Sequence, residues 1–146
     1  MTDSTKWKKL LTSNYHSFRI DGTLPNLNDF IDANRVMVRN AGHCFSKGNE
    51  LKQSAQRDVQ ACIRRDLKGV VIENPITITY CFYEPNRRRD KDNIAAFAMK
   101  VIQDALVKEG VIKNDGWKEI YSFECYFDID KVNPRIEVRL EELNQD

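Results

Sequence analysis

Two different hydrophobic periodicities follow one another in the middle of the chain and restrict the folds open to it. From residue 76 to residue 83, apolar side chains alternate with others in the two-residue period of a β-strand. From residue 93 to residue 109, apolar side chains recur every three or four residues, which is the period of an amphipathic helix. Gly110 ends this second pattern. The centre of the chain is therefore predicted to be a strand followed by a helix that packs on a sheet.

Patterns on either side complete the predicted fold. A strand is expected over 18–22, a short helix after the turn at 24–29, a loop over 40–48, and an amphipathic helix over 49–68. Two final strands, 120–127 and 135–140, are predicted to form a hairpin through the turn at 130–134. The order β-α-β-α-β-β predicts an α+β fold with a mixed sheet of about four strands and two main helices.

Size and composition agree with a single soluble domain. The chain has 146 residues, of which 41% are hydrophobic and 31% charged, so we expect one domain over 1–146 with a loose segment at 1–16. Four scattered cysteines without zinc-ligand spacing predict a cytoplasmic protein with reduced thiols, and the absence of a long apolar run predicts no membrane span. Net charge is only +1, so nucleic acid would have to bind local basic patches. The candidates are Arg64, Arg65, Arg87, Arg88, Arg89 and Lys91.

The candidate site begins where the second helix begins. Asp90 and Asp92 stand two residues apart beside the arginine run, and Asp115 follows the helix in an Asn-Asp-Gly turn. Carboxylate oxygens are the ligands that Mg²⁺ prefers, and phosphodiester hydrolysis commonly uses such a metal. Ordinary alternatives stay open: an aspartate before a helix is a common N-cap, the two acids can be simple salt-bridge partners of the neighbouring arginines, and Asp-Gly often marks only a turn. Only one of Asp90 and Asp92 can be the cap, so the pair favours a metal-dependent nuclease.

Two further polar residues lie within the predicted helix. Lys100 is a candidate for holding the scissile phosphate or stabilising the leaving oxygen, or is an ordinary surface lysine. Asp104 is predicted to pair with Lys100 or Lys108, four residues away on either side, rather than to bind metal.

The order of these motifs resembles the signature of the RusA family of Holliday-junction resolvases. The similar pieces are residues 89–93 (Arg-Asp-Lys-Asp-Asn), 100–106 and 110–115, together with the segment 24–28 after the first strand. The resemblance implies a small, dimeric, Mg²⁺-dependent endonuclease, often encoded by phages or prophages, that cuts four-way DNA junctions symmetrically. Mn²⁺ is a possible substitute for Mg²⁺. The resemblance further implies that Asp90, Asp92 and Asp115 bind the metal, that Lys100 is the essential lysine, and that the arginines contact DNA.

The chain departs from the family pattern at two positions. The family lysine usually follows the Asp-Asn pair by three residues, where this chain has Ala96, so Lys100 matches only if about four residues are inserted. The later turn often carries two acids, whereas here the first of them is Asn114. The site is therefore expected to carry one fewer negative charge.

The length of the predicted helix raises a geometric difficulty. Seventeen helical residues, 93–109, would span about 25 Å, and six further residues return at most about 20 Å. In one protomer with a straight helix, Asp115 would barely reach Asp92, so a site shared between the subunits of a dimer is a hypothesis. Two other functions stay open: a nuclease of the same chemistry that cuts flaps or forks, and a DNA-binding module without catalysis.

Overall fold

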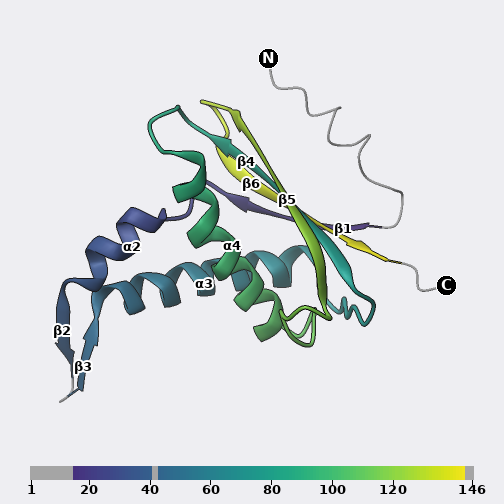
Figure 1. The fold of residues 1–146 in the computed structure, drawn as a ribbon, viewed down its shortest axis with the longest axis horizontal. Helices are drawn as coiled ribbons and strands as arrows, with labels where there is room; N and C mark the ends of the chain where they lie inside the picture. The colour runs from purple at the N-terminus through teal and green to yellow at the C-terminus, as the bar shows by residue number, and fades with distance from the viewer. Residues whose placement is uncertain (1–14, 41–42, 144–146) are drawn as a thin grey trace.

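The computed structural model of the chain describes residues 15–40 and 43–143. Four strands form the main sheet, and three helices lie on one side of it (Figure 1). The strands of this sheet are β1 (Tyr15–Asp21), β4 (Ile76–Glu84), β5 (Ile120–Ile129) and β6 (Arg135–Glu142). The helices are α2 (Leu27–Asn34), α3 (Lys47–Asp66) and α4 (Lys91–Lys108). The predicted α+β class and the four-stranded mixed sheet are confirmed.

The order of strands in the sheet is β1-β6-β4-β5. β6 runs antiparallel to both β1 and β4, whereas β5 runs parallel to β4. The predicted hairpin of the last two strands is therefore wrong, because β4 lies between β5 and β6. The sequence of β4 explains this place: its residues are buried on both faces of the sheet, apart from the half-buried Thr77. A strand covered on both faces belongs in the interior of a sheet, and the less buried β5 is left at the edge.

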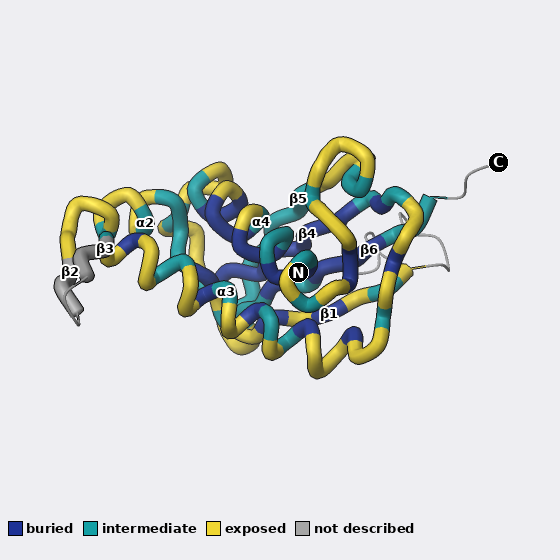
Figure 2. The backbone as a smooth tube through the Cα atoms, turned by 90° about the horizontal axis from the view of Figure 1, so that it is seen from below, coloured by how far each residue is buried: buried dark blue, intermediate teal, exposed yellow. Residues whose placement is uncertain are grey.

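The core lies between the sheet and the helices. One face of α4 packs its predicted apolar stripe, including Phe97, Val101 and Leu106, against β4 and β6. α3 contributes Val59 and Ile63 from the predicted i, i+4 pattern. α2 closes this layer through Phe30, whose ring centroid lies 5.5 Å from that of Phe97 on α4. In Figure 2 the buried parts of the tube gather where these elements meet, and the loops are exposed.

The boundaries of the first elements differ from those predicted. β1 begins at Tyr15, so residues 15 and 16 belong to the sheet, and the rest of the predicted loose segment lies outside the described residues. The predicted loop 40–48 instead contains a small antiparallel pair, β2 (Met37–Asn40) and β3 (His43–Ser46), followed directly by α3. This pair extends away from the main body (Figure 1). Ser46 caps α3 by accepting a hydrogen bond from the backbone N–H of Asn49, so the helix begins earlier than predicted.

The free edge of β1 is blocked by the end of α3. The backbone N–H of Arg19 donates to the carboxylate of Asp66 at 3.0 Å. The Arg65 guanidinium donates to the carbonyl of Arg19 and to the same Asp66 carboxylate. An ion pair thus satisfies backbone groups that would otherwise be open to another strand. In the described part of the chain, no helix is both long and apolar enough to cross a membrane.

Candidate functional site

The two acids of the central motif lie at the start of α4, and both are exposed. Asp90 occupies the N-cap position with extended backbone angles, and its carbonyl accepts the N–H of Ile94 at 3.0 Å. Its side chain makes no capping hydrogen bond. Asp92 lies in the first helical turn, where its carboxylate accepts the neighbouring N–H of Asn93 at 2.9 Å. Helix capping by the Asp90 side chain therefore does not account for this pair.

A cavity of about 650 Å³ opens beside these two acids. The parallel pairing of β4 with β5 brings the carboxyl ends of both strands to the same place as the amino end of α4. Asp128, near the end of β5, consequently lines the cavity together with Asp90 and Asp92. Sequence reasoning missed Asp128, because it lies just after the predicted strand 120–127 and far along the chain from Asp90 and Asp92. Finding it would have required knowing that β5 pairs parallel to β4, which places Asp128 next to the end of β4.

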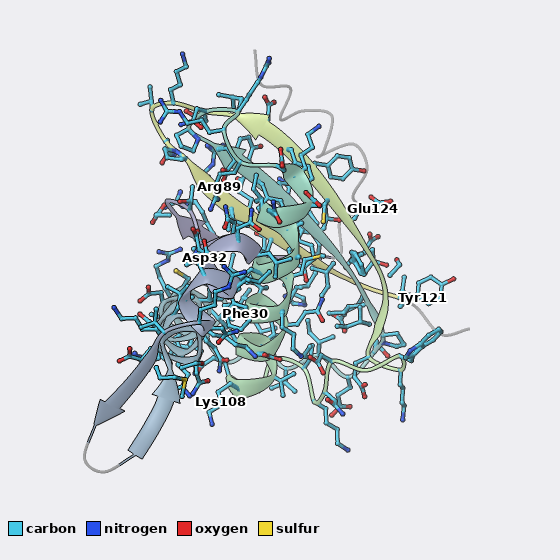
Figure 3. All side chains as sticks on the ribbon, turned by 60° about the vertical axis from the view of Figure 1, so that its left-hand side comes forward. Phe30, Asp32, Arg89, Lys108, Tyr121 and Glu124 are labelled. Carbon is cyan, nitrogen blue, oxygen red and sulfur yellow. The ribbon has the colours of Figure 1, made fainter. Side chains whose placement is uncertain are left out.

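Arg89 holds one wall of the cavity in place. Its Nε and Nη2 atoms each lie 2.9 Å from an oxygen of the Glu84 carboxylate, which is buried at the end of β4. Its Nη1 donates to the carbonyl of Leu24 at 2.7 Å. Arg89 therefore joins β4, the loop before α4 and the segment before α2 (Figure 3). A DNA contact by Arg89 stays a prediction, and its observed contacts are internal.

The other basic residues of the motif face outward. Arg87 and Arg88 are exposed, and the backbone N–H of Arg88 donates to the Asn86 side chain at 3.0 Å, which shapes the loop. Lys91 lies with its Nζ 5.7 Å from the centroid of the Phe127 ring. Arg87 and Lys91 also line the cavity of the two acids. Cations and carboxylates thus surround one opening, as a site for a metal and a phosphate requires.

Lys100 and Asp115 lie together, farther along α4. The Nζ atom of Lys100 lies 3.1 Å from a carboxylate oxygen of Asp104 and 3.5 Å from one of Asp115. The hydrogen bond to Asp104 and the charges of both acids raise the pKa of Lys100 above its ordinary value. Asp104 also pairs with Lys52 of α3 at 3.3 Å. The predicted Lys100–Asp104 pair is thus confirmed, and Asp104 serves to join two helices.

One protomer does not assemble the predicted set of three metal ligands. Lys100, which touches Asp115, stands eight residues after Asp92, which is about 12 Å along a helix. Among the described residues, no three acidic, histidine or cysteine side chains lie close enough together to hold a metal ion. The carboxylates of Asp90 and Asp92 beside the cavity have the chemistry that suits Mg²⁺, and Asp115 does not join them within the described part of one chain.

The second basic patch makes mainly structural contacts. Arg64 donates to Glu109 after α4 at 3.0 Å, with 59% of its side chain exposed. Arg65 pairs with Asp66 and with Asp21. Neither arginine lines the cavity of the acids. Their predicted contacts with DNA stay predictions.

Comparison with known protein families agrees with this arrangement. A family model described as "Endodeoxyribonuclease RusA" matches residues 32–141, which is most of the chain. The matched region contains both acids at the start of α4, the Lys100–Asp115 pair and all of β5. No curated protein matches the chain.

Proposed function

The chain belongs to the RusA family of endodeoxyribonucleases, and we propose that it uses Mg²⁺ to resolve four-way DNA junctions by paired phosphodiester hydrolysis. The observation that carries this proposal is the pair Asp90 and Asp92, exposed beside a cavity that is also lined by Arg87 and Lys91. Acids that served only for helix capping or ion pairing would be bound by protein donors, and the side chain of Asp90 has no such capping bond.

The ligand set proposed for the metal is Asp90, Asp92 and Asp115, with Mn²⁺ as a possible substitute for Mg²⁺. Mg²⁺ prefers oxygen ligands, usually keeps several waters, and is commonly held by one or two carboxylates together with substrate phosphates. When bound, the ion supplies Lewis-acid polarisation of a phosphodiester and lowers the pKa of a bound water. This proposal leaves Asp104 out, because two lysines already neutralise it.

The basic residues would bind and orient the DNA. Arg87 and Arg88 are exposed and free to contact backbone phosphates on either side of the scissile bond. Lys91 projects over Phe127 at the cavity wall, where it can reach a phosphate at the acids. Lys100 is already held beside Asp115, and its charge would offset the negative charge that develops on the leaving oxygen.

Symmetry supports a homodimer as the active species. A four-way junction has two-fold symmetry, and paired cuts require two sites related by a two-fold axis. One chain carries one copy of the Asp90–Asp92 motif, so two chains supply both sites.

A mobile four-way junction tests the proposal directly. We expect the wild type to make paired, symmetric nicks that require Mg²⁺, and Asp92→Asn to bind the junction without cutting it. Asp58→Asn is the matched control, because Asp58 is an exposed acid on α3 away from the cavity. Cutting by the wild type and by D58N, with none by D92N, would support the site as drawn.

The same assay separates the two other functions. Faster cutting of flaps or forks than of four-way junctions would indicate the related nuclease activity on a different branched substrate. Binding without cutting in either Mg²⁺ or Mn²⁺ would overturn the proposal and leave a DNA-binding module.

A further inference from the structure

The two-stranded ribbon formed by β2 and β3 stands apart from the rest of the fold. Its strands pair antiparallel, from Met37 opposite Ser46 to Asn40 opposite His43. In Figures 1 and 2 the ribbon extends beyond α2 and the start of α3, away from the main sheet. A two-stranded ribbon is at best marginally stable on its own, and α2, which leads into this one, has no buried residue. The ribbon therefore offers its surface to a partner rather than to the core of its own chain.

The sequence of this segment is basic throughout. Residues 33–49 contain Arg35, Arg39 and Lys47 but no aspartate or glutamate. The whole chain has 22 acids and a net charge of only +1, so an acid-free stretch of this length concentrates positive charge in one place. Arg35 lies 3.7 Å from Asp32, but solvent screens this pair because the two side chains are 76% and 74% exposed. The ribbon and its base thus form a basic patch of the kind that a nearly neutral protein needs to bind nucleic acid.

We propose that β2 and β3 form a DNA-binding ribbon that lies in the major groove of the substrate, within one helical turn of the scissile phosphate. This inference rests on the proposed nuclease function for the presence of that phosphate, and it adds a contact surface outside the cavity of the acids. The major groove admits a two-stranded β-ribbon, whereas the minor groove is about half as wide. Val36 and Met37, which are 48% and 60% exposed, are apolar side chains of the kind that contact thymine methyl groups in this groove.

The base of the ribbon is held by both neighbouring helices. The Ser46 hydroxyl donates to the side-chain oxygen of Asn34, at the end of α2, at 2.8 Å. The backbone N–H of Lys47, the first residue of α3, donates to the carbonyl of Val36 at 2.8 Å. Gly48 is buried against Asn34, and any Cβ at this position would collide with the Asn34 side chain. The direction of the ribbon is therefore set before DNA binds, which lowers the entropic cost of binding.

α2 places the ribbon near the cavity of the acids. The segment before α2 is tied to the cavity wall, because Arg89 donates to the carbonyl of Leu24 at 2.7 Å. The eight residues of α2 then span about 12 Å, and the four residues of each ribbon strand extend about 13 Å. In Figure 1, α2 lies between the amino end of α4 and the ribbon. One helical turn of DNA measures about 34 Å, so a duplex held at the cavity by its phosphates has the ribbon within one turn.

Removal of the ribbon tests the proposal without any need for cutting. Residues 38–45 are replaced by Asn-Gly, which closes two-residue hairpins and leaves the base of the ribbon in place. We expect this variant to keep the wild-type circular dichroism spectrum and to bind a four-way junction more weakly in EDTA. The slope of log K against log salt should fall by about one, because Arg39 is lost.

Point variants keep the test valid if the shortened chain fails to fold. Arg39→Gln should lower the salt slope by about one with the ribbon still present. Lys68→Gln is the matched control, because Lys68 is an exposed cation just beyond the opposite end of α3, and it should leave the slope unchanged. Equal slopes for the wild type, R39Q and the shortened chain would overturn the proposal. Unchanged DNA binding with an altered sedimentation coefficient would also overturn it, and would assign the ribbon to contacts between protein chains.

Chemical footprinting locates the contact. Dimethyl sulfate methylates guanine N7, which lies in the major groove. We expect the wild type to protect guanines within about ten base pairs of the cut, and the shortened chain to lose this protection while it stays bound. The same footprint with and without the ribbon would overturn the proposal. A wild type that shows ribbon-dependent protection but cuts no branched DNA in Mg²⁺ would contradict the proposed function and support the ribbon. A wild type that binds no DNA would overturn both.

Discussion

The guanidinium of Arg89 donates two hydrogen bonds of 2.9 Å each to the buried carboxylate of Glu84. Only 22% of the Arg89 side chain and 8% of the Glu84 side chain are exposed. This pair fixes the end of β4 relative to the loop that carries Asp90. The most basic part of the sequence is thus used partly to hold the site together.

Glu84→Gln should destabilise the fold without touching the acids of the site. Removing one partner of a buried ion pair leaves an uncompensated charge and costs about 3 kcal/mol in the free energy of unfolding. Urea denaturation at pH 7 measures this loss. Arg88→Ala is the control, because Arg88 is exposed and its loss should change stability by less than about 0.5 kcal/mol. Equal stability of E84Q and R88A would contradict a structural role for the Arg89–Glu84 pair.

Arg87→Ala and Arg88→Ala should each weaken DNA binding by a similar factor on all sequences. Each contact with a phosphate contributes about one unit to the slope of log K against log salt, so each variant should lower that slope by about one. Fluorescence anisotropy with a labelled junction, across several salt concentrations, measures the slope. Arg57→Ala, which removes an exposed arginine on α3 away from the cavity, should leave it unchanged. An unchanged slope in R87A and R88A would remove both arginines from the DNA interface.

Asp128→Asn should weaken metal binding and leave DNA binding intact. Asp128 lines the cavity of Asp90 and Asp92, and its carboxylate accepts the N–H of Ile129 at 2.7 Å, which holds it in place. Loss of an outer-shell acid typically lowers metal affinity by about 10- to 100-fold. Calorimetric titration with Mn²⁺ measures the affinity, and excess metal should restore cutting. Asp32→Asn, in the exposed part of α2, is the control. Identical Mn²⁺ affinities in D128N and D32N would show that the shared cavity has no bearing on the metal.

Asp66 should make stability depend on acid pH. The hydrogen bond from Arg65 lowers the pKa of the Asp66 carboxyl below its ordinary value. In the unfolded chain the group takes up its proton at higher pH than in the folded protein. Its stabilising contribution is therefore complete above about pH 4 and is lost as the pH falls through the lowered pKa. Urea denaturation at pH 7 and pH 3 should show a smaller difference for Asp66→Asn than for the wild type. An identical pH dependence of the two proteins would argue against this pair as an acid-sensitive contact.

Local patterns in the sequence predicted the elements better than their pairing. The apolar periodicity of α4 and the alternation in β4 reflect which of their side chains are buried, so both elements were predicted to within about two residues. The partner of β5 was mistaken because a five-residue turn suggests a hairpin, whereas the sheet places its most buried strand in the middle. That choice depends on the burial of β4 relative to β5, and no local pattern expresses it.

The candidate site was predictable to the extent that it lies in one motif. Asp90 and Asp92 are neighbours in the chain and share a helix end, so their proximity follows from the sequence. Asp128 joins them only through parallel strand pairing, which sequence spacing does not reveal. The role of Arg89 was hidden for a similar reason, because its partners Glu84 and Leu24 are set by the packing of β4 and α2.

The two edges of the sheet differ, and this difference bears on how far assembly can proceed. At the β1 edge the backbone N–H and carbonyl of Arg19 are taken by Asp66 and Arg65, whereas in the described part of the chain no strand or helix contact of this kind is seen beyond β5. A sheet with two open edges can add copies without end, as in fibrils. A sheet with one open edge can pair with only one other copy, because an isologous contact between the two open edges leaves none free. Arg65 and Asp66 therefore protect the β1 edge against the addition of a further strand, and their loss would leave the backbone of Arg19 open to pairing with another copy.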